Sequence, residues 1–399
     1  MIFASALRSV LKKYLSFLFI VVGLAIAPVR QSLHNSCYDS AFAKAYLLLV
    51  LFIGISLGGK AQTSRAYSNE FLNIGVDAAA LGMSNAVVAS SGNANSTYWN
   101  PAGLMQLEQQ EVSLMHASYF ANIAQYNYGS YAKPIDDDSA FGISVIRFSV
   151  DDILNTTQLI DDQGNINYDR ISTFSNADWA FAFSYARRAK LDGFSYGGNV
   201  KVIRRVIGDF ASSWGFGFDA GLQFRRGGYE IGFMARDITT TYNSWTIDDD
   251  EYATISGAVE GQNQELPETT EITLPKLQAG IARTFTIRYD HVLTAEVDLN
   301  MRFIQTNDVI SSSSFSATPA VGLQYGFLDL VFVRAGVGNF QNIDQLDGSE
   351  SLTMQPNIGV GFKYKGIAVD YALTDIGDSS EALYSNVFSL NVDLSVFSR

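Results

Sequence analysis

The stretch Trp214–Arg226, "WGFGFDAGLQFRR", alternates between two kinds of side chain. Aromatic and aliphatic residues occupy every second position, and glycine, aspartate and glutamine fill most of the positions between them. Successive side chains of a β-strand point to opposite faces of the sheet, so this pattern predicts a strand with one apolar and one polar face. The stretches Trp179–Ala186, Asn357–Tyr364 and Phe388–Val396 repeat the pattern.

The composition of the 399-residue chain favours an all-β fold. Aromatic residues make up 13% of the chain and glycine occurs 33 times, whereas charged residues reach only 17%. Aromatic residues favour strands and glycine favours turns. The apolar faces can pack on a second sheet or face lipid, and alternation alone does not separate a soluble sandwich from a membrane barrel.

The connections between the expected strands separate these two folds. The expected strands cover residues 111–120, 124–133, 140–150, 177–188, 193–207, 212–226, 229–237, 273–287, 291–303, 318–327, 330–340, 356–365, 367–374 and 385–397. The longer connections, residues 151–176, 238–272, 304–317, 341–355 and 375–384, all fall on one side, although the links 121–123 and 208–211 on that side are short. About fourteen strands with this asymmetry predict a transmembrane antiparallel β-barrel over residues 111–399 in the cell outer membrane of a Gram-negative bacterium, with both termini in the periplasm.

Residues 1–61 are unlike the rest of the chain. Arg8, Lys12 and Lys13 precede one apolar run, and a second run leads to Gly59-Lys60-Ala61, a small-x-small pattern that fits signal peptidase cleavage. We therefore expect residues 1–61 to be a signal or presegment, with residues 1–40 an incorrectly assigned start and Gln62 the mature N-terminus. The alternative is a membrane hairpin, but both runs are shorter than the ~20 residues that a spanning helix needs.

Residues 62–110 lack the alternation and are rich in Ala, Gly, Ser and Asn. They contain Asn100-Pro101-Ala102-Gly103, a turn sequence in which proline fixes φ and asparagine bonds to its own backbone. Small residues allow close packing in a confined lumen, so we expect a hatch or plug inside the barrel; a flexible periplasmic leader is the alternative. The candidate hatch residues are Gly82, Met83, Trp99, Asn100, Pro101, Ala102 and Gly103.

Charge and cysteine content exclude two classes of protein. The chain has 27 Lys and Arg against 40 Asp and Glu, a formal net charge of −13, and removal of the presegment leaves the remainder more acidic. Nucleic-acid phosphates require clustered basic residues, so we expect no nucleic-acid partner. The single cysteine, Cys37, lies in the presegment, so the rest of the chain can form no internal disulfide.

The polar faces of the strands predict a charged network in the lumen. Acidic and basic residues at inward positions are expected to pair across the barrel. The candidates are Lys201, Arg236, Glu296, Asp298, Lys363, Asp370 and Asp393.

One motif resembles a catalytic element. Gly193–Gly197 matches the G-x-S-x-G nucleophile elbow, which needs a strand-to-helix turn after the serine and a histidine partner. The residues after Ser195 continue as strand, and after the presegment the chain holds only His116 and His291. We therefore expect no enzyme activity, no cofactor and no metal site. The acidic runs 136–138, 161–162 and 248–251 could ligate calcium, but they lack EF-hand spacing and are interpreted as solvated loops.

The N-terminal segment resembles a known family. "NEFLNIGVDAAALGMSNAVVAS" (Asn69–Ser90) followed by "NSTYWNPAGL" (Asn95–Leu104) is similar to the N-terminal signature of the PorV/PorQ family, outer-membrane proteins of the Bacteroidetes type IX secretion system. It is more distantly similar to FadL-type fatty-acid transporters, which also carry an Asn-Pro-Ala turn in a hatch. The chain departs from the family at Asp77-Ala78-Ala79, where many relatives have Arg after the first Ala, and at Ser398-Arg399, which follow Phe397.

The resemblance implies two functions, which remain open at this point. A PorV-like barrel receives cargo with C-terminal sorting domains from the type IX translocon and passes it to the cell surface, so its partners are outer-membrane lipid, the translocon and those domains. A FadL-like barrel instead transports long-chain fatty acids or other hydrophobic small molecules through a lateral opening.

Overall fold

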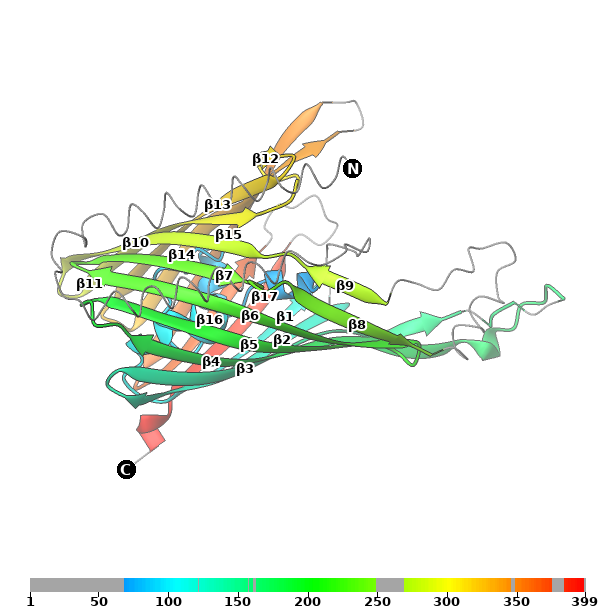
Figure 1. Ribbon diagram of the computed structural model, residues 1–399, viewed down its shortest axis with the longest axis horizontal. Coiled ribbons are helices and arrows are strands. Elements are labelled where there is room, and N and C mark those ends of the chain that lie inside the picture. The colour runs from blue at the N-terminus through cyan, green and yellow to red at the C-terminus, as the bar shows by residue number, and fades with distance from the viewer. Residues whose placement is uncertain are drawn as a thin grey trace, which may run out of the picture. The chain divides into compact units, whose positions relative to one another are not determined.

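The computed structural model describes residues 68–120, 122–156, 158–160, 163–248, 269–345, 349–374 and 384–397. Over these residues the chain forms a closed antiparallel β-barrel of fourteen strands (Figure 1), which confirms the predicted fold class. The expected presegment and the expected mature N-terminus Gln62 lie outside the described residues. In the described part of the chain, no helix is long and apolar enough to cross a membrane.

Of the seventeen strand segments, sixteen make up the fourteen barrel strands, and β12 pairs only with the start of β13. The segments are β1 (Glu111–Tyr119), β2 (Ala124–Asp136), β3 (Ser139–Asn155), β4 (Ser172–Arg188), β5 (Phe194–Ile207), β6 (Ala211–Arg226), β7 (Tyr229–Arg236), β8 (Thr241–Ile247), β9 (Thr270–Thr273), β10 (Lys276–Arg288), β11 (His291–Arg302), β12 (Ile310–Ser312), β13 (Phe315–Phe327), β14 (Val331–Asp344), β15 (Glu350–Tyr364), β16 (Ile367–Thr374) and β17 (Ser385–Asp393). β1 pairs with both β2 and β17, and this closes the barrel without a free edge.

Two barrel strands are interrupted at the same level of the wall. β7 and β8 together form the barrel strand beside β6. β10 and β9 form the next barrel strand, in which β10 pairs with β7 and β9 pairs with β8. Between β7 and β8, Asp237 and Thr240 adopt positive φ angles of 54° and 60°. Between β9 and β10 lies Pro275, which has no N–H to donate to a neighbouring strand.

The two faces of each strand follow the predicted alternation. On β6, Trp214, Phe216 and Phe218 are 52%, 59% and 44% exposed, whereas Gly215 and Gly217 between them are buried. In an outer-membrane barrel the apolar outer face contacts lipid and the opposite face lines the lumen.

The strands extend further than the sequence predicted. β3 and β4 continue their pairing as far as Asn155 with Ser172, and β14 and β15 as far as Asp344 with Glu350, inside segments that we expected to be loops. Figure 1 shows these two hairpins projecting from the same end of the barrel, which we call the outer end. On β15 the alternation does continue, because Leu352 and Met354 are 60% and 56% exposed, so the predicted start at residue 356 missed a signal that the sequence contains. On β3 a register shift between Val150 and Ile153 breaks the alternation, so period two no longer marks the paired residues there. The other end, with short turns, is the periplasmic end.

Residues 68–107, hereafter the hatch, lie inside the barrel. They form η1 (Glu70–Asn73), α3 (Ala78–Gly82), α4 (Ser96–Trp99) and η2 (Pro101–Gln106), the blue and cyan segment of Figure 1. α3 packs against β15, β16 and β17, and η2 packs against β4 and β5. Two further short 3₁₀ helices lie outside the hatch, η3 (Tyr168–Arg170) and η4 (Leu394–Phe397).

The hatch runs from the outer half of the lumen to the periplasmic end. Ser68, its first residue, bonds to Glu271 of β9 and accepts a bond from Asn243 of β8. Its last element, η2, leads into β1 at the opposite end. The described part of the hatch therefore begins beside strands of the outer half.

Candidate functional site: the hatch and its cavity

The turn at Asn100 fixes the centre of the hatch. Asn100 is fully buried, and its Oδ1 accepts the N–H of Ala102 at 3.2 Å, which caps η2. Its Nδ2 donates to the carbonyl oxygens of Val88, in the hatch, and Leu222, in β6, both at 3.0 Å. One amide side chain therefore joins the turn to a second hatch segment and to the barrel wall. Pro101 starts η2, where a missing N–H costs nothing.

Glycines let the hatch backbone approach the wall. A Cβ added at Gly336 of β14 would lie 2.6 Å from the backbone nitrogen of Ser84, and one added at Gly322 of β13 would lie 2.8 Å from Met83 Cβ. Gly82 of the hatch meets the wall in the same way, because a Cβ there would lie 3.0 Å from Gly359 Cα. Any side chain at these positions would push the hatch away from the wall.

The remaining predicted hatch residues are all buried. Ala102 and Gly103 belong to η2, and a Cβ added at Gly103 would lie 2.8 Å from Ser96 Oγ. Trp99 is 3% exposed, and its indole N–H donates to the carbonyl of Val76 at 3.0 Å. The seven residues thus lie in two places, Gly82 and Met83 against β13–β15, and residues 99–103 against β5 and β6.

Two carboxylates of β11 hold the backbone of the hatch. Asp298 accepts the N–H groups of Val87 and Val88, both at 3.0 Å, and Glu296 accepts that of Ala89 at 2.6 Å. Both side chains are buried, at 0% and 1% exposure. We expected these carboxylates to pair with basic side chains across the barrel; instead they satisfy backbone donors that have no partner of their own in a sheet or helix.

A buried cluster of charges lies where β7 and β8 meet. Lys201 Nζ is 2.8 Å from Asp219 Oδ1 and 2.6 Å from Asp237 Oδ1, and all three side chains are buried. Asp237 also donates its backbone N–H to Asp219 at 2.9 Å. The sequence prediction named Lys201 but missed both partners. Asp219 occupies an inward position in the alternation of β6, so the same signal could have found it.

Arg236 connects the wall to the hatch. Its Nη2 donates to the carbonyl of Tyr98 at 2.9 Å, and its guanidinium carbon lies 4.3 Å from the centroid of the Tyr98 ring. Burial raises the pKa of Tyr98 above its ordinary value, so the phenol stays protonated and donates to the carbonyl of Leu72 at 2.6 Å.

The other predicted lumen residues divide into two groups. Asp370 is buried and pairs with Arg334 at 2.6 Å, a partner that the sequence analysis missed. Lys363 and Asp393 do not join the lumen network. Lys363 pairs with exposed Asp329 at 2.9 Å, and Asp393 accepts the N–H of Ser395, both at the periplasmic rim. Both residues occupy inward-facing positions of their strands, but they lie outside the part of the lumen that the hatch fills.

Ser195 is a structural residue of the hatch contact. Its hydroxyl is buried and donates to the carbonyl of Ala102 at 3.0 Å, and β5 continues past it as a strand. His116 is bonded to Asn127 and His291 to Tyr325. No nucleophile elbow is formed at this serine.

In the described part of the chain, no group of three or more His, Cys, Asp and Glu could hold a metal ion. The acidic residues 161–162 and 249–251, which we considered as calcium ligands, lie outside the described residues.

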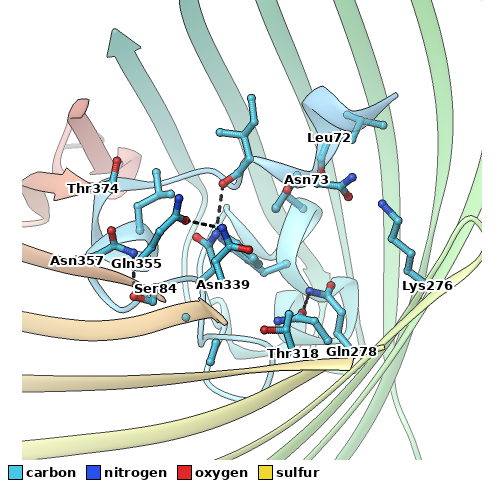
Figure 2. A pocket seen from close by; sticks show the side chains of 18 of the residues that line it. Leu72, Asn73, Ser84, Lys276, Gln278, Thr318, Asn339, Gln355, Asn357 and Thr374 are labelled. Carbon is cyan, nitrogen blue, oxygen red and sulfur yellow. Dashed lines mark hydrogen bonds between the residues drawn. The ribbon is translucent and has the colours of Figure 1, made fainter. Parts of the chain in front are cut away.

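A cavity of about 430 Å³ lies on the outer side of the hatch (Figure 2). Leu72, Ile74, Leu81 and Trp99 contribute its hatch side. The barrel wall contributes an apolar part, Tyr119, Phe120 and Phe148, and a polar part from β10, β11 and β13–β15, namely Lys276, Gln278, Asn300, Arg302, Thr318, Asn339, Gln355 and Asn357. The lumen therefore holds a packed hatch and, on its outer side, a cavity with an apolar and a polar part.

The N-terminal part of the chain matches a known family. Residues 60–221 match the family model of "Type IX secretion system protein PorV". No curated protein sequence matches the chain.

Solved structures similar to the chain include a Pseudomonas aeruginosa FadL homologue (13% identity, 80% of this chain and 98% of that chain, TM-score 0.46). They also include the P. putida toluene transporter TodX (14% identity, 80% and 98%, TM-score 0.48). A third is the Ralstonia pickettii toluene transporter TbuX (12% identity, 80% and 98%, TM-score 0.46).

Proposed function

We propose that this chain is a member of the PorV family of type IX secretion system proteins and acts as a non-enzymatic outer-membrane barrel in protein export. The observation that carries the proposal is the family match over residues 60–221, a range that contains the whole hatch and β1–β5. The barrel lies in the outer membrane of a Gram-negative cell, with its outer face in lipid and its longer hairpins at the cell surface.

The partners within this function are also part of the proposal. We infer that the outer end receives exported proteins through their C-terminal sorting domains, after release from the type IX translocon, and passes them on for attachment at the surface. The packed hatch supports a role in handover, because Asn100, Glu296 and Asp298 hold it in the lumen by bonds to backbone groups from both hatch and wall.

The test compares a deletion strain with its parent and with a strain complemented by the wild-type chain. We expect proteins with C-terminal sorting domains to be missing from the surface and medium of the deletion strain and to accumulate in the periplasm. Unchanged secretion together with a loss of fatty-acid or aromatic-hydrocarbon uptake would contradict the proposal and favour the transport alternative.

A catalytic control accompanies the test. The PorV family is not an enzyme family, and Ser195 is engaged by the hatch carbonyl. Complementation with Ser195→Gly, which removes the hydroxyl without adding bulk, is expected to restore secretion.

A further inference from the structure

The cavity above the hatch has two unlike sides. Its apolar part comes from Tyr119, Phe120 and Phe148, near the outer ends of β1 and β3. Across from it, side-chain amides of the wall are bonded in pairs, Gln278 to Asn300 at 2.6 Å and Asn339 to Gln355 at 2.8 Å, and Asn357 bonds to Ser84 of the hatch at 2.8 Å (Figure 2). Each primary amide carries two N–H donors and a carbonyl acceptor, so Gln278 and Asn300 retain N–H donors beyond their mutual bond and the bond that Gln278 accepts from Arg236.

Two cationic side chains lie next to each other on the polar side. Lys276 of β10 is paired in register with Arg302 of β11, and both line the cavity. Lys276 Nζ is 3.7 Å from Glu70, whose side chain is half exposed. Within the described residues, Arg302 has neither an ion pair nor a hydrogen bond from its side chain. This differs from Arg236, whose guanidinium is already bound by Tyr98 and Gln278.

This charge balance favours an anionic ligand. Two neighbouring cations with one loosely held carboxylate leave an excess of positive charge in a partly enclosed space, where charge interactions are stronger than in bulk water. Figure 2 shows Lys276 extending from the wall toward the hatch segment that carries Leu72 and Asn73.

The polar side indicates what carries the anion. An alkyl chain lying along Gln278 and Asn300 would cut their remaining N–H donors off from water, and this costs free energy. The backbone of an extended polypeptide instead offers N–H and C=O groups along its whole length, and its alternate side chains can face the apolar part. A volume of about 430 Å³ falls within the usual range of ligand pockets and suits a segment of a few residues.

We infer that the cavity binds a short extended polypeptide segment and that Lys276 and Arg302 hold a carboxylate of this segment. The inference rests on the proposed function, for which it names the chemistry that the outer lumen recognises in an exported protein. The carboxylate can be a chain terminus or an acidic side chain, and both sources present the same two oxygens to the cations.

The test uses the full chain in detergent and isothermal titration calorimetry with three synthetic probes. The first is acetyl-Thr-Val-Thr-Val with a free carboxylate, the second is the same peptide with an amide terminus, and the third is amidated but has aspartate in place of the second threonine. We expect the free acid or the aspartate peptide to bind at least about tenfold more tightly than the neutral peptide, the equivalent of one ~1.4 kcal/mol interaction. Whichever of the two binds identifies the source of the carboxylate.

Variants assign the binding to the two cations. Arg302→Gln and Lys276→Gln should each weaken the charged peptide about tenfold and leave the neutral one unchanged, and Arg302→Lys should retain part of the binding. Lys363→Gln, at the periplasmic rim, is the matched control and should change nothing. The protease resistance of the hatch, compared with that of the wild-type chain, verifies that each variant is folded.

Three results would overturn the inference. These are equal affinities for charged and neutral peptides, absence of binding by all three probes, and displacement of the peptide by octanoate at a lower concentration than by the free-acid peptide. The last result would indicate a site for acyl chains. These outcomes are separate from the secretion test, because a deletion strain that loses secretion while the purified chain binds no peptide contradicts only the inference.

Discussion

Neighbouring residues of β6 show how differently the two faces of the barrel wall are specified. Leu222 faces outward and is 41% exposed, and in the membrane any apolar side chain of similar size would serve there. Gly221, one residue earlier, faces the hatch, and a Cβ at this position would lie 2.9 Å from Pro101 Cδ. The outer face requires only apolar side chains, whereas each position of the inner face requires a particular residue that fits its partner in the hatch.

The largest effect is expected from Asn100→Asp. The substitution removes the two N–H donors that bind the carbonyls of Val88 and Leu222 and places a carboxylate against these oxygens. A buried, unpaired charge of this kind costs several kcal/mol, on the order of 3–5. We expect the hatch to become accessible to protease while the barrel stays folded, as judged by its heat-dependent mobility on gels.

Asn165→Asp is the control for this prediction, because Asn165 is exposed in the β3–β4 connection. If both variants gave the same protease pattern, the hatch would not depend on the bonds of Asn100.

Gly336→Ala should give the next largest effect. The added methyl group would meet the backbone of Met83 and Ser84, which cannot rotate away as a side chain could. Overpacking of this kind costs about 1–3 kcal/mol. Hydrogen exchange measured by mass spectrometry should therefore show faster exchange in residues 83–91.

Gly129→Ala is the matched change on the opposite face. A Cβ there would make only ordinary contact, 3.5 Å from Leu114 Cδ2. Equal exchange in the two variants would remove the distinction between the faces.

Asp298→Asn should have a smaller effect on the hatch. Both N–H groups bond to the same oxygen, Oδ2, so the amide oxygen can still accept both, but it is a weaker acceptor for Val87 and Val88 than a carboxylate. Loss of charge assistance is worth about 1–2 kcal/mol. The measurement is hydrogen exchange at the amides of these two residues, with Asp329→Asn at the exposed rim as the control.

The smallest effect is expected from Phe216→Leu on the outer face. Phe216 is 59% exposed on the barrel and has no partner in the hatch. The hatch should exchange as in the wild-type chain, and barrel stability should change by less than about 0.5 kcal/mol. Faster exchange in the hatch would show that the two faces are energetically coupled.

Several properties of this chain could be predicted from its sequence because they repeat. The period-two alternation occurs in strand after strand, so it predicted the all-β barrel, its strand number and the orientation of residues such as Trp214 and Gly215. The turn chemistry of Asn100-Pro101 is local, and the structure shows it as the start of η2.

The extent of β3 and β4 at the outer end could not be predicted, because the pairing of Ile153 with Phe174 lies beyond a register shift that interrupts the alternation. The position of the hatch entry could not be predicted either, since Ser68 is located by Asn243 and Glu271, which are far from it in sequence.

The sequence by itself determined which residues face the lumen, because side-chain direction in a strand depends only on parity. The tertiary structure alone decided which of them meet. Glu296 and Asp298 had basic candidates as partners in the sequence, yet they bind the backbone of the hatch, because the closed barrel brings Val87–Ala89 beside β11. Likewise Lys276 and Arg302 become neighbours only through the register of β10 and β11, which backbone pairing sets.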